Sequence, residues 1–480
     1  MKQILLTLLA LCTLPLHAEG RLPQTDTTPP DSLLQARIDS LITHRLPAGS
    51  EAGISIYDLS ADKPLYSYRA DKLCRPASTM KLLTTITALD RPEADEPFRT
   101  EVWYHGTVRQ DTLHGDLYVV GGFDPEFDDL ALDSLVSQIA AQPFSVVAGH
   151  IYGDISMKDS LYWGSGWLWD DNPSSFQPYL SPLMLCKGCV SVTATPAPLR
   201  GDTALITCHP LSSYYSVKNT TLTRTPAAGR FRVTRNWLTN GNRISIAGNV
   251  DSRRQTSVNL YSSQDFFMHT FTERLQARGI TSPTTYSYKE LQKDTLVVRI
   301  ASFETATQAV VDEIMKESDN LNAEALLCRL AVQATGHRHV TAEEGLDEVR
   351  QLMKRLGHDP KRYRLADGCG LSNYNYITPE LLVSFLKYAY SHTDLFRKLY
   401  KALPIAGTDG TLEHRMNRGT RAYRNVHAKT GSFTAINCLA GYLRTPSGHQ
   451  IAFAIMNQNI LSAREARAFQ DALCELLLMP

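Results

Sequence analysis

The sequence predicts an α+β fold in which one domain is interrupted by a large insertion. Segments that alternate apolar and polar residues like strands lie near both ends of the chain, at 53–68 and 427–457. Helical patterns fill much of 307–390, and the stretch 91–288 instead carries short β-like runs separated by turn residues. Matching patterns at the two ends are typical of a single sheet that an inserted region divides.

Length and composition narrow the class of protein. At 480 residues the chain exceeds one ordinary core, so we expect two or three domains. Hydrophobic residues make up 43% and charged residues 20%, which is typical of a globular protein. The 49 basic residues balance the 49 acidic ones, so no global field draws the chain to nucleic acid or anionic lipid.

The N-terminus predicts export. Lys2 precedes an apolar run, Ile4–Leu14, and Ala18 supplies a small residue before a cleavage point. We therefore expect a signal peptide at 1–18 and a mature protein in the periplasm or cell envelope. The run is too short for a transmembrane span. Cys12 follows a bulky leucine, which argues against a lipid anchor.

Eight cysteines would remain in the mature chain: Cys74, Cys186, Cys189, Cys208, Cys328, Cys369, Cys438 and Cys474. An exported protein can oxidise them. The pair Cys186 and Cys189, followed by Cys208-His209, resembles half of a zinc ribbon, but a second paired motif is missing. We expect a local disulfide or buried thiols there, and no metal.

The first part of the divided domain is expected at 31–90. Gly53–Leu59 alternates like a strand, Ser60–Pro64 has the composition of a turn, and Leu65–Tyr68 returns as the second strand of a hairpin. Met80–Leu89 is apolar enough for a buried helix, and Ser78 stands at its N-terminus.

The inserted region, 91–288, is expected to be mostly β, with one or two subdomains. Its strand-like runs are Leu117–Val120, Ile151–Asp154, Ile244–Ala247 and Ser257–Tyr261. The second part of the divided domain is expected at 289–480. Its expected helices are Thr307–Glu317, Asn320–Gln333, Gly345–Leu356, Pro379–Tyr390 and Ser462–Leu478. Its expected strands are His427–Thr430, Cys438–Leu443 and Ile451–Asn457.

Three short motifs follow one another along the chain: Ser78-Thr79-Met80-Lys81, Ser318-Asp319-Asn320 and Lys429-Thr430-Gly431. Each alone is compatible with a helix cap or a surface charge. Ser-x-x-Lys also occurs at Ser60 and at Ser384, and Ser-x-Asn at Ser257. Only Ser78 both opens an apolar helix and precedes the other two motifs, so order and context select it.

These residue types supply the parts of acyl transfer through a serine ester. Lys81 lies one helical turn after Ser78 and can activate its hydroxyl, provided that burial or the charge of Lys429 lowers its pKa. Ser318 can pass a proton to the leaving amine, and Asn320 can hydrogen-bond a peptide amide.

The third motif fits the binding of a chain end. Lys429 and Thr430 can bind a free carboxylate, and Gly431 lets a substrate strand approach closely. The backbone N–H groups of Ser78 and Ser432 can stabilise an oxyanion. This chemistry requires neither a metal nor an organic cofactor.

With these residues placed, the chain resembles the class C low-molecular-mass penicillin-binding proteins, the serine D-Ala-D-Ala carboxypeptidase/endopeptidase family. The resemblance rests on the three motifs with their flanking residues, and on Leu403–Leu412 and Leu439–Tyr442. A large insertion between the first two motifs is a family hallmark. The resemblance implies a discontinuous transpeptidase-like domain of the penicillin-binding/serine β-lactamase type, with an antiparallel sheet flanked by helices.

The resemblance also implies a function: hydrolysis of peptidoglycan stem peptides and cross-links through an acyl-enzyme on Ser78, with β-lactam antibiotics as inhibitors. Gly166–Asp171 is similar to a family segment whose last aspartate meets the free amino group of diaminopimelate. That implies a substrate-binding role for Asp171, although a surface acid in an aromatic loop fits equally well. A serine β-lactamase and a catalytically idle peptidoglycan-binding scaffold are the alternatives.

Two segments depart from the family pattern. Where the family has Asp-Gly-Ser-Gly-Leu-Ser-Arg, this chain has cysteine at 369 and asparagine at 373. Cys186-Lys187-Gly188-Cys189 replaces an asparagine-rich segment. The first departure leaves the shape of the loop 367–373 open and does not touch the three motifs.

Overall fold

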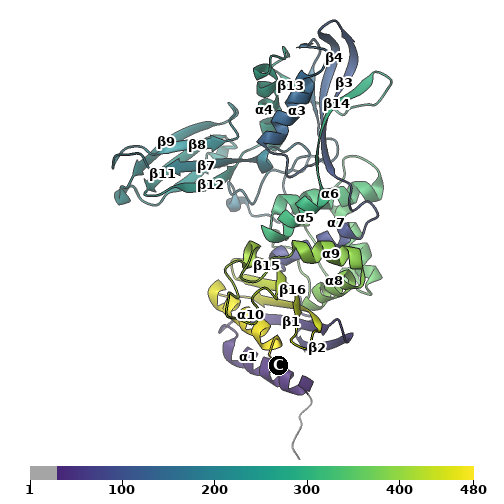
Figure 1. Cartoon of the computed structure of the whole chain (residues 1–480), viewed down its shortest axis with the longest axis vertical. Helices are drawn as coiled ribbons and strands as arrows, with labels where there is room; N and C mark the ends of the chain where they lie inside the picture. Colours follow the sequence, from purple (N-terminus) through teal and green to yellow (C-terminus); the bar gives the residue numbers. More distant parts are fainter. Residues whose placement is uncertain (1–29, 480) are drawn as a thin grey trace, which may run out of the picture.

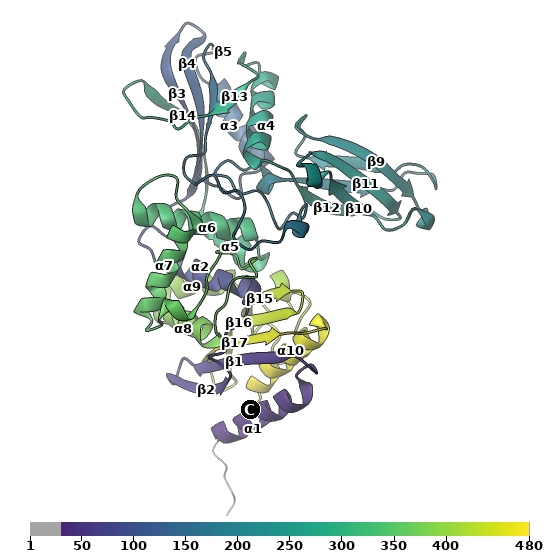
Figure 2. The same cartoon turned by 180° about the vertical axis from the view of Figure 1, so that it is seen from behind.

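The computed structural model describes residues 30–479, so the predicted signal peptide lies outside the described residues. The molecule is elongated (Figure 1). A sheet covered by helices lies at one end, with α1 (Pro30–Arg45) and α10 (Ala463–Leu477) packed side by side. Two β-rich lobes lie at the other end, and Figure 2 shows the same arrangement from behind. Within 30–479, no helix is long and apolar enough to cross a bilayer.

The two ends of the chain build one five-stranded sheet, in which all neighbouring strands are antiparallel. Its strands, in order across the sheet, are β15 (His427–Phe433), β16 (Ile436–Arg444), β17 (Gln450–Gln458), β1 (Glu51–Asp58) and β2 (Lys63–Tyr68). The predicted hairpin and the three predicted C-terminal strands are all present. The α+β fold class is confirmed.

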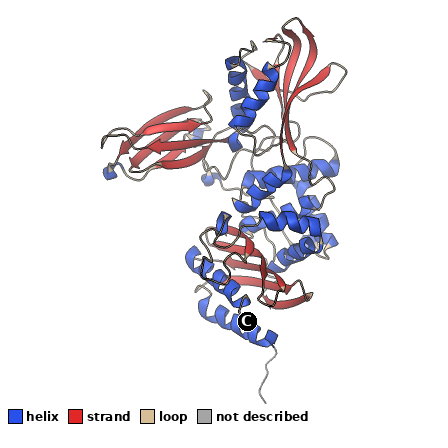
Figure 3. Cartoon of the chain, in the orientation of Figure 1, coloured by secondary structure: helices blue, strands red, loops and turns tan. Residues whose placement is uncertain are grey.

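The central strands β16 and β17 are buried along almost their whole length, because both faces of the sheet are covered. Helices α1 and α10 cover one face, and α8 (Pro379–Ser391) packs on the other, against β17 and β1. Strands covered on both faces carry almost continuous apolar residues, as these do. Figure 3 shows the helices on both sides of this sheet.

A layer of helices separates the sheet from the inserted region. Helix α2 runs from Met80 to Leu89, as predicted, and all its residues are buried, including Lys81. The other helices are α5 (Thr307–Lys316), α6 (Asn320–Thr335), α7 (Ala342–Arg355) and α9 (Thr393–Ala402). Sequence analysis did not anticipate α9.

The first lobe of the inserted region is a six-stranded sheet with two helices. Its strands are β3 (Phe98–Arg109), β4 (Thr112–Gly121), β5 (Val146–Val147), β6 (Ile151–Asp154), β13 (Tyr286–Tyr288) and β14 (Val297–Thr305). Strand β14 pairs with β3, so this sheet extends beyond the expected boundary at 288. Its helices are α3 (Asp129–Ala140) and α4 (Ser263–Ala277).

The second lobe contains two three-stranded sheets. One has β12 (Arg254–Asn259), β7 (Cys189–Thr195) and β8 (Leu205–His209), and the other has β10 (Arg232–Arg235), β11 (Arg243–Val250) and β9 (Ser216–Thr223). Short 3₁₀ turns complete the chain: η1 (Ala77–Thr79), η2 (Trp169–Asp171), η3 (Cys186–Gly188), η4 (Pro226–Ala228), η5 (Trp237–Thr239), η6 (Pro360–Arg362) and η7 (Gly410–Leu412). All eight cysteines expected in the mature chain are free thiols.

Candidate active site

Ser78 lies in η1, the tight turn that leads into α2. Ala77 before it has a left-handed backbone, with φ of 47°. Two glycines pack against this turn from opposite sides. A Cβ on Gly370 would lie 2.0 Å from the carbonyl oxygen of Ala77, and one on Gly431 would lie 2.6 Å from that of Pro76. Only glycine permits these approaches, so the loop 367–373 and β15 hold the turn that carries Ser78 between them.

Lys81 is fully buried beneath Ser78. Its Nζ lies 3.1 Å from Ser78 Oγ, 2.6 Å from Asn320 Oδ1 and 2.6 Å from the Cys369 carbonyl oxygen. Burial lowers the pKa of Lys81, although nearby acidic groups, Cys369 and Asp367 first among them, oppose the shift. The first two motifs therefore meet at one amine.

The geometry suits a neutral lysine as a base. A neutral amine has two N–H donors and one lone pair. The Asn320 oxygen and the Cys369 carbonyl take the two donors, which leaves the lone pair directed toward Ser78 Oγ. Lys81 is thus oriented to accept the proton of the hydroxyl.

The third motif reaches the second through Lys429. This side chain is fully buried, and its Nζ donates to Ser318 Oγ at 2.7 Å and to the Thr430 carbonyl at 3.0 Å. Burial, followed by the charge of Lys81, lowers the pKa of Lys429 well below its usual range. Ser318 itself has a left-handed backbone with φ of 62°, a conformation that a non-glycine residue adopts only under restraint.

Contacts from the inserted region supply part of that restraint. The Asn320 side chain donates to the carbonyl of Phe176 at 2.8 Å. Asp319 caps α6 by accepting from the Asn322 N–H at 2.9 Å, and its second oxygen accepts from Lys187 Nζ at 2.8 Å. The Ser-Asp-Asn turn is therefore held from both sides.

Lys187 is a residue whose importance the sequence did not indicate. It stands at the centre of η3, in the Cys186–Cys189 segment, and also pairs with Glu126 at 2.9 Å and Glu313 at 3.5 Å. Burial opposes its charge, but the carboxylates of Asp319 and Glu126 outweigh this effect and raise the pKa of Lys187.

The cleft above Ser78 divides into two cavities. One, of about 410 Å³, is lined by Ser78, Ser318, Asn320 and Ser432 and by Asp171 of the inserted region. The Asp171 carboxylate has no hydrogen-bond or ion-pair partner within residues 30–479. Burial, and then the neighbouring Asp170, raise the pKa of Asp171. A cationic group in this cavity would complement the unpaired carboxylate.

The second cavity, of about 510 Å³, opens on the other side of Ser78 and Ser318. Thr430 lines it and donates to the Thr411 hydroxyl at 2.8 Å. Arg415 and Arg467 line its far end. Strand β15 lies at the edge of its sheet, so one row of its backbone groups is available to a substrate strand. The structure thus brings every predicted site residue to one cleft.

The loop 367–373, where the sequence departs from the family pattern, is closed around Asp367. Its carboxylate accepts from the backbone of Gly370 and Ser372 and from the side chains of Asn375 and Trp167. The sulfur of Cys369 lies 3.5 Å from this carboxylate and accepts from the Leu371 N–H at 3.4 Å. The thiol thus makes local polar contacts of the kind a serine hydroxyl would make.

Asn373, the second departure, is half-buried and lines the cavity that contains Asp171. Its carbonyl accepts from Arg75 Nε at 3.1 Å. A backbone acceptor does not depend on the side chain at 373, so this tie to the Ser78 segment does not require the arginine of the family pattern.

Comparison with known proteins agrees with this geometry. The D-Ala-D-Ala carboxypeptidase 3 (S13) family matches residues 34–478. A D-alanyl-D-alanine carboxypeptidase of Actinomadura sp. (strain R39) is 28% identical over 456 residues, which cover 92% of this chain and 83% of the relative. The D-alanyl-D-alanine carboxypeptidase DacB of Haemophilus influenzae is 24% identical, and the match covers 86% of each chain.

Solved structures share the fold. The crystal structure of penicillin binding protein 4 (dacB) from Haemophilus influenzae aligns with a TM-score of 0.78 at 23% identity, covering 91% of this chain and 97% of that chain. A predatory peptidoglycan endopeptidase from Bdellovibrio bacteriovorus aligns with a TM-score of 0.51 at 16% identity, covering 88% of this chain and 91% of that one. Since the family match spans nearly the whole described chain, the protein belongs to the D-Ala-D-Ala carboxypeptidase 3 (S13) family of serine peptidases.

Proposed function

We propose that this enzyme hydrolyses the D-Ala-D-Ala bond of peptidoglycan stem peptides and the corresponding bond of their cross-links, with Ser78 as nucleophile. One observation carries the proposal. Hydrogen bonds link Ser78, Lys81 and Asn320 at one side of a single cleft, and Ser318 and Lys429 at the other. The two groups are joined through the Ser-Asp-Asn turn.

The chemistry follows from these positions. Neutral Lys81 takes the proton of Ser78 while Oγ attacks the carbonyl of the penultimate D-Ala, and the oxyanion lies near the N–H groups of Ser78 and Ser432. Ser318, held by Lys429, passes a proton to the leaving amine as the C–N bond breaks. Ser318 then regains its proton from Lys81, which is neutral again. Water attacks the ester, Lys81 takes a proton from that water, and the same proton passes to Ser78 Oγ as the ester C–O bond breaks.

Substrate groups match the two cavities. The terminal carboxylate of the leaving D-Ala meets Lys429 and Thr430, while the peptide aligns along the edge strand β15. A free side-chain amine on the stem peptide, such as that of diaminopimelate, pairs with Asp171 in the other cavity. A cross-linked partner would leave through the second, larger cavity.

Location and domain organisation belong to the same proposal. Export through the segment 1–18 would place the enzyme in the periplasm or cell envelope, beside its substrate. We assign 30–90 and 306–479 to the transpeptidase-like domain and the residues between to the inserted region, because β14 completes the insert's sheet. The proposed chemistry uses side chains, backbone N–H groups and water.

The decisive experiment combines labelling with turnover. A penicillin-treated sample should carry the adduct on Ser78 by peptide mass spectrometry, and the protein should release D-Ala from a diaminopimelate pentapeptide. Ser78→Ala should lose both activities and keep its thermal unfolding temperature. A slowly hydrolysed adduct fits a peptidase, whereas rapid loss would indicate a β-lactamase. Labelling elsewhere, or no D-Ala release, would refute the proposal.

The role of Asp171 has a matched control in its neighbour. Asp171→Ala should lower turnover of a pentapeptide with a free side-chain amine at least about tenfold more than turnover of the acetylated peptide. Asp170→Ala should leave this ratio unchanged, because Asp170 is exposed and does not line the cavity. Equal losses on both peptides would remove Asp171 from the substrate site.

A further inference from the structure

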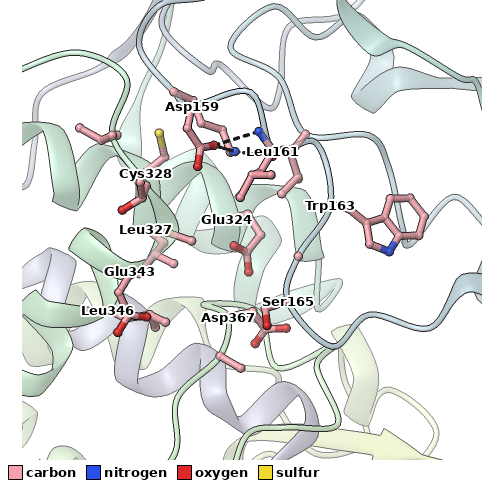
Figure 4. A pocket seen from close by; sticks show the side chains of 17 residues that line it. Asp159, Leu161, Trp163, Ser165, Glu324, Leu327, Cys328, Glu343, Leu346 and Asp367 are labelled. Atoms are coloured by element: carbon pink, nitrogen blue, oxygen red, sulfur yellow. Dashed lines mark hydrogen bonds and ion pairs between the residues drawn. The ribbon is translucent and has the colours of Figure 1, made fainter.

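A cavity lies behind the active-site loop, between residues 158–165 of the inserted region and the helices α6 and α7 (Figure 4). It has a volume of about 220 Å³. Its walls are largely hydrocarbon, from Leu161, Trp163, Leu180, Leu327, Val340 and Leu346. A dry cavity of roughly 150 Å³ holds benzene in another protein, so this one has room for a ring with a short chain.

The carboxylate of Glu324 lies inside this cavity, and no cation among residues 30–479 pairs with it. Glu324 of α6 is only 5% exposed, and Figure 4 shows its carboxylate in the middle of the cavity. Its Oε1 accepts from the backbone N–H groups of Gly368 and Cys369 at 2.9 and 2.8 Å. Besides these two N–H groups, only the weak S–H donor of Cys369 interacts with the carboxylate, and no cation pairs with Glu324 in the described part of the chain. A buried acceptor of this kind favours a donor from a ligand.

The other charges around the cavity are matched. Lys158 donates to Asp159 (dashed in Figure 4) and to the Leu161 carbonyl. Glu343 pairs with Arg350 at 2.7 Å. Both oxygens of Asp367 accept several hydrogen bonds each. Glu324 therefore has the weakest set of partners among the charged groups that line the cavity.

A metal ion fits this place poorly. Ligand atoms of Glu324, Asp367 and Cys369 lie within 4.8 Å of one another. However, the Asp367 oxygens and Glu324 Oε1 already hold the loop together, and an ion would have to displace those donors. A ligand with a single cationic donor needs only Oε2, the Glu324 oxygen that accepts from no backbone N–H.

We propose that this cavity is a binding site for a small apolar primary amine, whose ammonium group pairs with Glu324 and whose hydrocarbon part fills the space below Leu161. The site is separate from the cleft that contains Ser78. It is coupled to the cleft, because Glu324 holds the Cys369 backbone and the Cys369 carbonyl accepts from Lys81. An occupant therefore acts on the position of the base.

Benzylamine is the probe, and benzyl alcohol is its neutral isostere. Both are titrated into the full chain by ligand-observed NMR after Ser78 has been acylated with penicillin, which blocks the cleft. Benzylamine should bind saturably and at least about tenfold more tightly than the alcohol. Glu324→Gln should remove that preference. Ala342→Trp, at the rim of the cavity, should weaken both ligands.

Asp171→Ala distinguishes this site from the proposed substrate site, because benzylamine binding should survive that substitution. Equal affinity for amine and alcohol, or binding lost with Asp171→Ala, would overturn the proposal. The proposal would also be overturned if Zn²⁺ competed with benzylamine for the site in wild type but not in Glu324→Gln. If Glu324→Gln fails to fold, judged by the loss of its thermal unfolding transition, Ala342→Trp decides. Unchanged benzylamine binding in Ala342→Trp would also refute the site.

Discussion

Replacing Lys187 by methionine should slow acylation of Ser78, although the two residues do not touch. Lys187 holds Asp319, the middle residue of the Ser-Asp-Asn turn, and Ser318 before it has a strained left-handed backbone. Methionine keeps much of the volume of the lysine stem and removes its charge. The turn then loses its restraint on the side of the inserted region.

The structure sets the size of the effect. The two short ion pairs, to Asp319 at 2.8 Å and to Glu126 at 2.9 Å, are partly buried. After discounting for solvent, each is worth about 1 kcal/mol. If the transition state loses the whole of about 2 kcal/mol, the rate falls by about 30-fold, and if it loses about 1 kcal/mol, the rate falls by about fivefold. We therefore expect the acylation rate constant to fall by about 5- to 30-fold.

The assay is the second-order rate constant for acylation by a fluorescent penicillin, well below the unfolding temperature. Arg274→Met is the matched control, because Arg274 is 21% exposed against 27% for Lys187. Arg274 also pairs with more than one carboxylate, here Asp129 and Asp133. It lies in α4, away from the cleft. Lys187→Arg should restore most of the rate. If Lys187→Met and Arg274→Met acylate equally fast, the positioning role is wrong.

Three further predictions concern the nucleophile turn and the base. Gly431→Ala should cut acylation and lower the unfolding temperature, because its Cβ would press on the Pro76 carbonyl; unaffected labelling would contradict this. Burial lowers the pKa of Lys81 below 10.5, and only the neutral amine accepts a proton. The acylation rate should therefore rise as the pH rises through this pKa. A rate that does not change with pH would count against Lys81 as the base. Burial, followed by the charge of Asp367, raises the pKa of Glu324 to about 7. Wild type should therefore lose stability relative to Glu324→Gln as the pH rises from 4.5 to about 7. A difference in unfolding temperature that stays constant over this pH range would contradict the raised pKa.

The elements that the sequence predicted well have a local signature. The strand segments at both chain ends and α2 are dense in apolar residues with a clear period. Helix α9 was missed because its buried residues are only Leu395, Leu399 and Ala402, among charged neighbours. We propose a later end for the inserted region than the sequence suggested, because β14 pairs with β3 of that region. Pairing over such a distance in sequence leaves no local pattern.

The same distinction between local sequence patterns and contacts of distant segments applies to the site. Ser78, Ser318 and Lys429 could be found because each motif has its own residue pattern and the order of the motifs selects among chance matches. The partners that orient them could not. The Asn320 side chain is held by the Phe176 carbonyl, and any residue type supplies a carbonyl. Lys187 looked like one more surface lysine until folding placed it against Asp319.

These contacts change what the inserted region does for the enzyme. If it only supported substrate, its link to the motifs would be Asp171 alone, at the far wall of the cavity. Instead the Phe176 carbonyl holds Asn320, and Lys187 holds Asp319. Trp167 donates to Asp367, in the loop whose Cys369 carbonyl orients Lys81. Each of the first two motifs thus depends on the insert for its geometry. If the inserted region were removed, the proposed catalytic side chains would still be present, but their arrangement would be lost.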